Sequence, residues 1–455
     1  MFTREFLDTI MKAYDVRGLV DKEITPDFAF ALGASFARFL EEEREPATVV
    51  IGEDMRPSSP LLAQAFADGV TSQGFDAIRI GLASTDMAYF ASGKLNLPGA
   101  MFTASHNPAE YNGIKLCKSA ARPIGQETGL RRIRDLIVEG VPLSTRAMGK
   151  VTEKDMLNDY VDFLLSLFGS ELTSAERRLK VVIDAGDGMA GHTAPAVMAR
   201  LNVEVIPMYF ELDGTFPNHE ANPIDPKNVR DLQKAVKKHK ADIGLAFDGD
   251  ADRCFLIDEK GEIVTPSALT SLIAVRELKR KPGAPVIYNL ISSKAVPEVI
   301  SENGGKPVRS RVGHSYIKAM MAETGAVFGG EHSGHFYFTD FWRADSGMLA
   351  ALFALAELSG SQKNLSELLA PYNRYILSGE INTRVSDTQA ALQLIRDSFT
   401  QDYEIDELDG VTVTADEWWF NVRPSNTEPL LRLNVEAVNE ATMKKVRDKV
   451  LKLIG

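Results

Sequence analysis

The chain has 455 residues, of which 44% are hydrophobic and 25% are charged, and its formal net charge is −12. A chain of this length exceeds a single hydrophobic core, and its composition is that of a globular protein with three or four domains. The acidic charge argues against general nucleic-acid binding and against adhesion to anionic membranes.

No targeting or membrane segment is apparent. Charged residues such as Arg4 and Asp8 interrupt any apolar core of a signal peptide, and the longest apolar run, residues 348–356, is too short to cross a bilayer and predicts a buried helix. Cys117 and Cys254 stand far apart without CxxC spacing, which fits two ordinary thiols in a reducing compartment. We therefore expect a cytoplasmic protein.

The N-terminal part alternates helices and strands. Its predicted elements are a helix, a strand, a helix and two strands, at residues 26–40, 49–51, 59–74, 77–80 and 100–102. The last strand leads into Thr103-Ala104-Ser105-His106-Asn107-Pro108. Because Pro108 disfavours helical geometry at Asn107, we expect this loop to stay open and to leave the Ser105 hydroxyl reachable. A polar turn without chemistry is the alternative.

The same order of elements recurs twice. The second pass has strands at 180–183, 203–206 and 243–247, and the third has strands at 286–288, 308–312 and 326–328. The last strands of these passes lead into the polar loops 248–253 and 330–335. Such alternation predicts parallel or mixed sheets covered by helices, with ligands beyond the carboxyl ends of the strands. We expect the three polar loops to share one cleft.

The C-terminal part has a different pattern. A strand at 380–385, a helix at 388–399, the hairpin signal Asp409-Gly410 and a closing helix at 440–453 predict an α+β domain. Trp418 and Trp419 are expected to be packing residues. The predicted fold is therefore three similar α/β domains with mixed sheets plus a C-terminal α+β domain around a central cleft. The expected boundaries are 1–150, 151–255, 256–369 and 370–455.

Three carboxylates alternate with small residues in Asp248-Gly249-Asp250-Ala251-Asp252. In an extended chain the alternation aims all three at one side, where they repel one another unless a cation neutralises them. Hard oxygen ligands predict Mg²⁺ or Ca²⁺ rather than zinc. An EF-hand loop is disfavoured because Arg253 stands where glycine is needed and a strand precedes the loop. A solvated acidic turn is the remaining alternative.

A different class of function is indicated by the stretch 186–191, which reads GxGxxG after a predicted strand, as in NAD enzymes. The acidic residue expected about twenty positions later is poorly matched by Glu204 or Glu211. Asp187 would also lie uncomfortably close to a pyrophosphate. An NAD-dependent oxidoreductase stays open as an alternative.

Two further loops carry side chains that are suited to binding a ligand. Arg423-Pro424-Ser425-Asn426-Thr427 combines a guanidinium with hydroxyls and an amide that suit a phosphate, and Arg432 is expected to point the same way. Glu331 and Ser333 suit sugar hydroxyls. A serine hydrolase is disfavoured because neither Ser105 nor Ser333 lies in GxSxG. His219 and His239 are expected to be surface residues.

Taken together, the loops at 103–108, 248–253, 330–335 and 423–429 resemble the four signature loops of the α-D-phosphohexomutase superfamily, over essentially the whole chain. The Gly-Glu-His-Ser-Gly-His loop resembles the bacterial phosphomannomutase/phosphoglucomutase branch; phosphoglucosamine mutases usually have Gln where His332 stands. The resemblance implies a phosphomannomutase acting on hexose phosphates through a phosphoserine and a hexose 1,6-bisphosphate, which also serves as the priming activator. Phosphoglucomutase activity, dual activity and a catalytically silent sugar-phosphate binder are the alternatives, and the oligomeric state is open.

The resemblance also implies roles for individual residues. Ser105 would carry the phosphate, and a phosphate oxygen would complete a Mg²⁺ site with Asp248, Asp250 and Asp252. The other expected catalytic residues are Arg17, His106, Lys115 and His314. The expected substrate-binding residues are Tyr14, Arg253, Lys294, Gly313, Glu331, Ser333, His335, Arg423, Ser425, Asn426, Thr427 and Arg432. One departure is Ile291, where relatives carry a substrate lysine, so that Lys294 one turn later is the candidate replacement. The last domain is expected to close over the substrate to exclude water.

Overall fold

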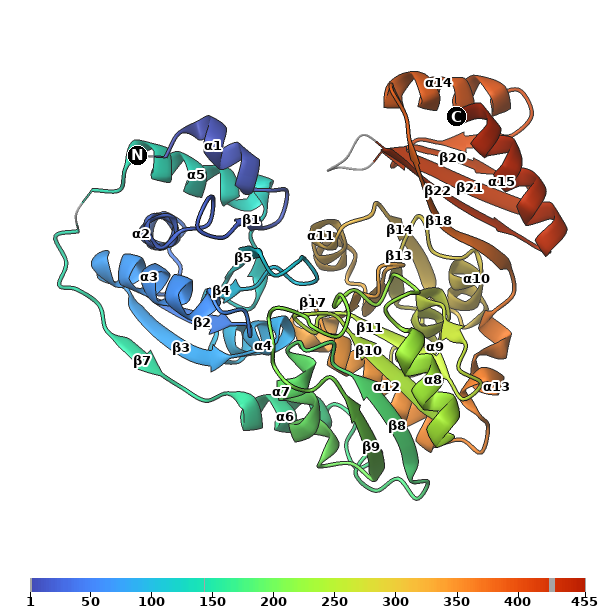
Figure 1. Ribbon diagram of the computed structural model, residues 1–455, viewed down its shortest axis with the longest axis horizontal. Coiled ribbons are helices and arrows are strands. Elements are labelled where there is room, and N and C mark those ends of the chain that lie inside the picture. The colour runs from blue at the N-terminus through green and yellow to red at the C-terminus, as the bar shows by residue number, and fades with distance from the viewer. Residues whose placement is uncertain (1, 143, 425–429, 455) are drawn as a thin grey trace. The chain divides into compact units, whose positions relative to one another are not determined.

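The computed structural model describes residues 2–142, 144–424 and 430–454 (Figure 1). The chain divides into two compact units, Met1–Thr265 with Ser333–Leu368, and Pro266–His332 with Leu369–Gly455. Among the described residues, no helix has both the length and the apolar character needed to cross a membrane.

The first unit begins with a mixed sheet in the order β1-β5-β4-β2-β3-β7, with β6 paired to β5. Its strands are β1 (Val16–Leu19), β2 (Thr48–Glu53), β3 (Asp76–Leu82), β4 (Gly99–Phe102), β5 (Tyr111–Lys118), β6 (Arg122–Pro123) and β7 (Val151–Glu153). The helices around it are α1 (Arg4–Ile10), α2 (Pro26–Glu42), α3 (Ser59–Ser72), α4 (Thr85–Leu95) and α5 (Leu130–Glu139). Strand β2 pairs in parallel with β3 and β4, whereas β5 runs antiparallel to β4.

One face of this sheet is covered by α1, α2, α3 and α5, whose apolar residues form a buried core with β2, β4 and β5. Helix α2 starts at the N-cap Thr25, whose side chain accepts a hydrogen bond from the N–H of Phe28. Pro26 fits the first turn because the backbone N–H groups there have no partner within the helix, so the N–H that proline lacks is not missed. Helices α2 and α3 touch backbone to backbone, since a Cβ on Gly33 would lie 2.2 Å from the carbonyl oxygen of Phe66. Right-handed crossovers place α4, between β3 and β4, on the opposite face.

The second sheet of this unit has the order β12-β11-β10-β8-β9. Its strands are β8 (Leu179–Asp184), β9 (Val203–Met208), β10 (Ile243–Phe247), β11 (Cys254–Asp258) and β12 (Ile263–Val264), with helices α6 (Leu157–Ser166), α7 (Ala190–Met198) and α8 (Arg230–His239). The unit also contains the antiparallel pair β16 (Phe336–Phe338) and β17 (Ala344–Asp345). The predicted buried helix is confirmed as α12 (Gly347–Ser359), which is apolar and buried almost all round.

The second unit contains parallel strands and an antiparallel sheet. Helix α13 (Leu365–Leu369) leads into it from the first unit. The parallel strands are β13 (Pro285–Asn289), β14 (Lys306–Ser310) and β15 (Phe328–Gly330), with helices α9 (Pro266–Arg280), α10 (Ala295–Glu302) and α11 (His314–Thr324). The antiparallel sheet has the order β18-β22-β21-β20-β19, formed by β18 (Ile376–Arg384), β19 (Glu404–Asp406), β20 (Val411–Thr414), β21 (Trp418–Pro424) and β22 (Leu430–Ala437). Helices α14 (Thr388–Phe399) and α15 (Glu440–Ile454) lie on one face of that sheet (Figure 1).

The predicted fold class is confirmed. In each of three parallel sets the first strand pairs with both the second and the third, giving β3-β2-β4, β9-β8-β10 and β14-β13-β15. The third strand of each set leads into one of the predicted polar loops. Helix α4 and strands β5 and β11 were not predicted, and the strand expected at 308–312 lies at Lys306–Ser310. The central cleft stays a prediction.

Candidate active site

The loop after β4 closes into a tight turn around Ser105. The N–H of Asn107 donates to the carbonyl oxygen of Ala104 (3.0 Å), and Ser105 has a left-handed φ of 50°. The residue is only 5% exposed, and its hydroxyl donates to Oδ2 of Asp248 (2.8 Å). The prediction of an open loop with a reachable hydroxyl is therefore wrong. A left-handed conformation at a non-glycine residue costs free energy and is typical of functional sites.

A buried arginine organises this turn. The Arg56 guanidinium donates to the carbonyl oxygens of Ser105 (3.0 Å), Asn107 (2.7 Å), Pro108 (2.8 Å) and Tyr111 (3.0 Å). It is 1% exposed and is paired with the buried Asp54 at 3.3 Å. Sequence reasoning missed Arg56, although it follows strand β2 at the sheet edge that carries the polar loops. Its planar fork of donors suits several carbonyl oxygens at once.

The acidic loop brings its three carboxylates together in a way that was not predicted. The N–H of Ala251 donates to the carbonyl oxygen of Asp248 (3.0 Å), so the loop is a turn and not an extended segment. Asp248, Asp250 and Asp252 nevertheless each place a carboxylate oxygen within 4.8 Å of the others, and all three are buried. The loop joins two antiparallel strands, which excludes the helix–loop–helix of an EF-hand.

Two cations offset the charge of the acidic cluster. Nζ of Lys115 lies 2.7 Å from Oδ2 of Asp250 and 2.7 Å from Oδ2 of Asp252. The Arg253 guanidinium donates to Oδ2 of Asp248 (2.8 Å). In the part of the chain that the structure describes, Oδ1 of Asp250 and Oδ1 of Asp252 are buried without a hydrogen-bond partner. Orphaned carboxylate oxygens are costly unless a cation binds them, so the oxygen-only donor set fits Mg²⁺.

Burial and neighbouring charges shift the pKa values of the charged residues in this cluster in different directions. Burial raises the pKa of Asp248 to about 7; the Arg253 charge lowers it, and the charges of Asp250 and Asp252 raise it. Burial also opposes the ionisation of Asp250, but the charge of Lys115 and its hydrogen bond lower the pKa of this carboxyl group. Burial disfavours the Lys115 ammonium, yet the two aspartates hold its pKa well above the usual value. Lys115 is therefore a fixed cation between two carboxylates.

His106 and Arg17 lie beside the serine. Nδ1 of His106 lies 3.1 Å from Oγ of Ser105 and accepts a hydrogen bond from the Arg253 guanidinium. Burial and the charges of Arg253 and Arg17 hold the pKa of His106 well below its usual value, which makes it a neutral acceptor at neutral pH. Arg17 donates to Oδ1 of Asn107 (2.7 Å) in the serine loop. The half-buried Tyr14 stands three residues before Arg17.

A second group of buried polar residues supports the acidic loop. The Thr85 hydroxyl donates to Oδ2 of Asp250 (2.6 Å), and the Thr85 N–H donates to the carbonyl oxygen of Asp250 (2.9 Å). The neighbouring Asp86 accepts the hydroxyls of Ser84, Tyr160 (2.7 Å) and Ser346 (2.6 Å). Burial raises the pKa of Asp86 to about 6, although these hydroxyls lower it. Periodicity of the sequence gives no sign of this group, because its members come from three distant segments.

His335 joins the site from a third segment of the same unit. Its Nδ1 lies 2.8 Å from Oδ2 of Asp345 and 3.7 Å from Oδ1 of Asp252. Burial lowers the pKa of His335, but the charges of Asp252 and Asp345 together with the Asp345 hydrogen bond raise it overall. Ser333, two residues earlier in this unit, is half-buried.

The GxGxxG stretch packs against the acidic loop. The N–H of Met189 donates to the carbonyl oxygen of Gly249 (2.9 Å), and a Cβ on Gly188 would lie 2.7 Å from the same oxygen. Gly249 in turn faces the serine loop, since a Cβ on it would lie 2.3 Å from the carbonyl oxygen of Ser105. The glycines therefore allow three loops to stack closely.

One of the histidines expected on the surface is not free there. Nε2 of His219 lies 3.1 Å from Oδ2 of Asp184, and its side chain is 17% exposed. Burial lowers the pKa of His219, but the hydrogen bond and charge of Asp184 outweigh that effect and raise it to about 9. The prediction is thus wrong for His219, whereas His239 is exposed as expected.

In the second unit, Glu331 is buried and accepts the N–H of Gly313 (3.0 Å). Arg423 and Arg432 both contact Glu380, at 3.1 and 3.2 Å. The side chain of His314 and the residues Ser425, Asn426 and Thr427 lie outside the described residues.

Lys294, the expected replacement of the substrate lysine, contacts residues that belong to none of the predicted polar loops. Lys294 lines a small pocket with Tyr375, Trp419 and Glu436, and its backbone N–H donates to Glu436 (2.8 Å). Ile291 is buried. The prediction that Trp419 packs is confirmed, because it is buried and its indole N–H donates to Glu436 (2.7 Å).

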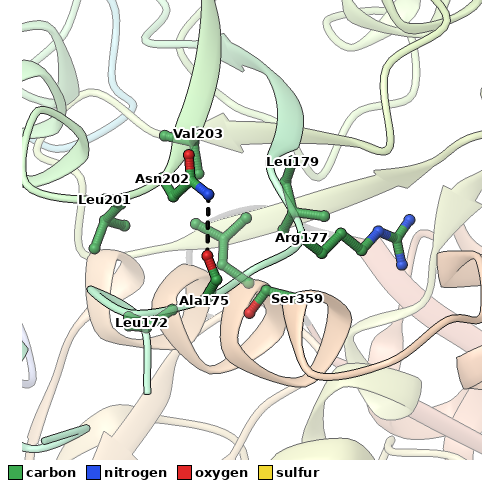
Figure 2. Close-up of a pocket in the computed structure, with 9 residues that line it drawn as sticks. Leu172, Ala175, Arg177, Leu179, Leu201, Asn202, Val203 and Ser359 are labelled. Atoms are coloured by element: carbon green, nitrogen blue, oxygen red, sulfur yellow. Dashed lines mark hydrogen bonds between the residues drawn. The ribbon is translucent and has the colours of Figure 1, made fainter. Parts of the chain in front are cut away.

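A separate pocket of the first unit is no part of this site. Figure 2 shows it between α12 and the start of β8 and β9, where Asn202 donates to the carbonyl oxygen of Ala175 (3.0 Å). Most of its lining is apolar and includes Leu172, Leu179 and Leu201. None of the polar-loop residues lines it.

Four domain models match the chain in succession. The model described as phosphoglucomutase/phosphomannomutase, alpha/beta/alpha domain I, matches residues 8–140, domain II matches residues 158–261, and domain III matches residues 265–375. The C-terminal domain of the same description matches residues 380–453.

Relatives match over nearly the whole chain. The phosphomannomutase of Salmonella typhimurium is 38% identical over 454 residues, covering 97% of this chain and 98% of the relative. A Xanthomonas campestris protein named phosphohexose mutases is 39% identical over 440 residues, covering 96% of each. The crystal structure of a phosphoglucomutase/phosphomannomutase family protein from Burkholderia thailandensis matches with a TM-score of 0.90 at 30% identity. That match covers 100% of this chain and 97% of the other.

Proposed function

The chain belongs to the phosphoglucomutase/phosphomannomutase family, and we propose that it is a Mg²⁺-dependent phosphomannomutase that interconverts mannose 6-phosphate and mannose 1-phosphate. Phosphoglucomutase or dual activity is the close alternative, in keeping with the broader name of the Xanthomonas relative. An NAD-dependent oxidoreductase is excluded by the family, and the glycines that resemble a dinucleotide fingerprint serve loop packing instead.

The contact between the Ser105 hydroxyl and Asp248 carries this proposal. It places the serine oxygen 2.8 Å from a carboxylate of a buried acidic cluster with two orphaned oxygens. A cluster of this kind is built for a divalent cation, and a serine in hydrogen-bond contact with it is positioned to carry a phosphoryl group.

Asp248, Asp250 and Asp252 would hold the Mg²⁺, together with an oxygen of the Ser105 phosphate. When bound, the ion neutralises charge on the transferring phosphoryl group. Lys115 and Arg253 keep the carboxylates oriented through the contacts described above. Arg17 supplies a further positive charge at the serine loop, and the neutral His106 lies 3.1 Å from Oγ of Ser105 and accepts a hydrogen bond from the Arg253 guanidinium.

The reaction balances as two phosphoryl transfers. A hydroxyl oxygen of the hexose phosphate attacks the Ser105 phosphate, the Oγ–P bond breaks and a new O–P bond forms, and the proton of the attacking hydroxyl ends on Oγ of Ser105. The hexose 1,6-bisphosphate turns over within the site and returns its other phosphate to Ser105. Because the sugar must bind in two opposite orientations, the groups that hold the sugar and the distal phosphate must accept the sugar either way round.

These groups come from the remaining predicted residues. We assign Glu331, Ser333, His335, Gly313 and Tyr14 to the sugar. We assign Arg423, Ser425, Asn426, Thr427 and Arg432 to the distal phosphate. His314 is assigned to the catalytic centre, and Lys294 stays a prediction. We also keep a four-domain division with boundaries at residues 150, 255 and 369. The order of the four family models supports the four domains, and residue 150 lies between the first two matches, whereas 255 and 369 lie a few residues inside the second and third. A cytoplasmic location stays part of the proposal, and it is in keeping with the two buried cysteines, Cys117 and Cys254, which stand far apart in the sequence.

A coupled assay with mannose 1-phosphate and glucose 1-phosphate tests this function, using the parent protein and Ser105→Ala. The parent is expected to convert both and to favour mannose 1-phosphate. Ser105→Ala is expected to lose at least about a thousandfold in kcat, since covalent catalysis is removed. Full activity in Ser105→Ala would rule out the phosphoserine mechanism.

A further inference from the structure

Two arginines of the second unit lie directly opposite each other on neighbouring strands. Arg423 on β21 pairs with Arg432 on β22 in the antiparallel register. Like charges directly opposite one another on a sheet destabilise the pairing. Arg423 is buried, with an exposed fraction of 8%, so its charge is poorly screened by water.

One carboxylate bridges this pair. Oε2 of Glu380 lies 3.1 Å from Nη2 of Arg423, and Oε1 lies 3.2 Å from Nη1 of Arg432. A β-bulge between Leu377 and Glu380, with Gly379 at a φ of 71°, sets the register in which Glu380 meets these arginines. In this register Glu380 lies opposite Asn434, and Asn382, two residues further along β18, lies opposite Arg432.

Glu380 uses only a small part of the hydrogen-bonding capacity of the two guanidinium groups. Each guanidinium has five N–H donors, and the carboxylate accepts from one nitrogen of each. Within the described segments, Nε of Arg423 and Nε of Arg432 are both buried without a partner. As far as the described residues go, these two Nε–H groups therefore remain as donors for an additional anion while Glu380 stays in place.

We propose that Glu380 is a positioning residue that acts as a built-in counter-anion: it holds Arg423 and Arg432 together and limits how tightly they bind the distal phosphate of the substrate. This proposal rests on the proposed function for the identity of the phosphate. With Glu380, the two arginines present about one net positive charge to the phosphate dianion, and without it they present two. Removal of one negative charge a few ångströms away is expected to tighten phosphate binding by about tenfold.

A moderate affinity is useful in a mutase. The bisphosphate intermediate must release one phosphate from these arginines before its other phosphate can take that place. Tight binding that is equal in all states lowers KM without raising kcat, and it slows any step that requires release. Glu380 would therefore raise kcat at the cost of a higher KM.

Titration calorimetry with inorganic phosphate, and separately with mannose 6-phosphate, tests the proposal on the full-length protein. Glu380→Gln and Glu380→Ala are expected to lower the Kd by about tenfold. In the mutase assay both variants should show a lower KM together with a lower kcat. Glu380→Asp keeps the charge and should return both parameters toward those of the parent.

Glu302→Gln is the matched control, because Glu302 pairs with Arg374 in the same unit and its loss changes the net charge equally. It should leave the Kd unchanged. The double variant Glu380→Gln with Arg423→Gln should lose the tightening, which locates the effect at this pair.

A folded Glu380→Gln with an unchanged or higher Kd would overturn the proposal. Loss of folded protein in both neutral variants would overturn it as well, since Glu380 would then be a structural residue. These titrations do not depend on phosphoryl transfer, so they stay informative even if Ser105→Ala is fully active.

Discussion

At the scale of single residues, the site depends on close pairing of buried charges. Lys115 is shared by Asp250 and Asp252, and Arg253 is held by Asp248. Each pair would be costly to break, because the partner left behind is a buried uncompensated charge. The orphaned oxygens of Asp250 and Asp252 are the exception, and they mark where a cation belongs.

Gly249→Ala tests the close stacking of the two central loops. The new Cβ would lie 2.3 Å from the carbonyl oxygen of Ser105, so the serine loop must move. We expect a loss of about 1–3 kcal/mol in stability and at least a tenfold loss in kcat. Thermal denaturation and the mutase assay measure these effects. Gly360→Ala is the control, since Gly360 has an ordinary φ of −78° and its nearest neighbour would be 3.3 Å away; equal effects in both variants would contradict the explanation.

The ion pair of His219 with Asp184 predicts a pH dependence of stability. The folded-state pKa of about 9 lies above the usual value of 6.5, so the stabilisation is complete below pH 6.5 and is lost as the pH rises through 9. The parent should therefore exceed His219→Gln in melting temperature by the most at pH 6 and by little at pH 10. The exposed His239→Gln should show no such trend. A difference in melting temperature between the parent and His219→Gln that grew with pH would contradict this explanation.

At the scale of secondary structure elements, each of the three predicted polar loops follows the third strand of a parallel set. Alternation of strands and helices was enough to predict this arrangement, because it depends only on apolar periodicity and on polar breaks after β4, β10 and β15. Helix α4 was missed because the helix is buried on nearly all sides, so its sequence does not alternate between an apolar and a polar face. Strand β5 was missed because the polar residues Asn112 and Lys115 interrupt its apolar run.

Arg56→Lys tests how the serine turn is held. Lysine keeps the positive charge but cannot reach four carbonyl oxygens with a planar fork. We expect a loss of about 2–4 kcal/mol in stability, since buried carbonyl groups lose their donors, and a lower kcat. Denaturant unfolding is the measurement. Arg38→Lys, on the exposed side of α2, should change stability by less than about 0.5 kcal/mol, and a similar change in both variants would contradict the role of Arg56.

At the scale of the whole molecule, the sequence predicted which segments carry chemistry better than it predicted how they meet. The serine loop and the acidic loop meet in one unit, as expected. Their predicted conformations, an open serine loop and an extended acidic loop, were wrong. Both loops are tight turns with left-handed residues, Ser105 and Ala251. Left-handed geometry at serine and alanine comes from tertiary contacts, which residue preferences do not reveal. The support by Arg56 and Asp86 depends on distant segments for the same reason.

Binding of Mg²⁺ should stabilise the entire first unit. At a concentration one hundred times the Kd, the ion is expected to add about 2.7 kcal/mol to stability, because it binds the folded state alone. Thermal denaturation after treatment with EDTA, with and without added Mg²⁺, measures this effect. Asp250→Asn should abolish the rise in melting temperature, whereas Asp162→Asn at the surface should preserve it. An equal rise in Asp250→Asn would place the ion elsewhere.

The most direct test of the phosphoserine mechanism is to locate the phosphate on the protein. The parent is incubated with hexose 1,6-bisphosphate and Mg²⁺, digested, and analysed by mass spectrometry of the peptide that contains Ser105. We predict one phosphoryl group on Ser105, its loss when the phosphorylated protein is mixed with excess mannose 6-phosphate, and no phosphoryl group in Ser105→Ala. An active protein whose Ser105 peptide is never phosphorylated would contradict the account.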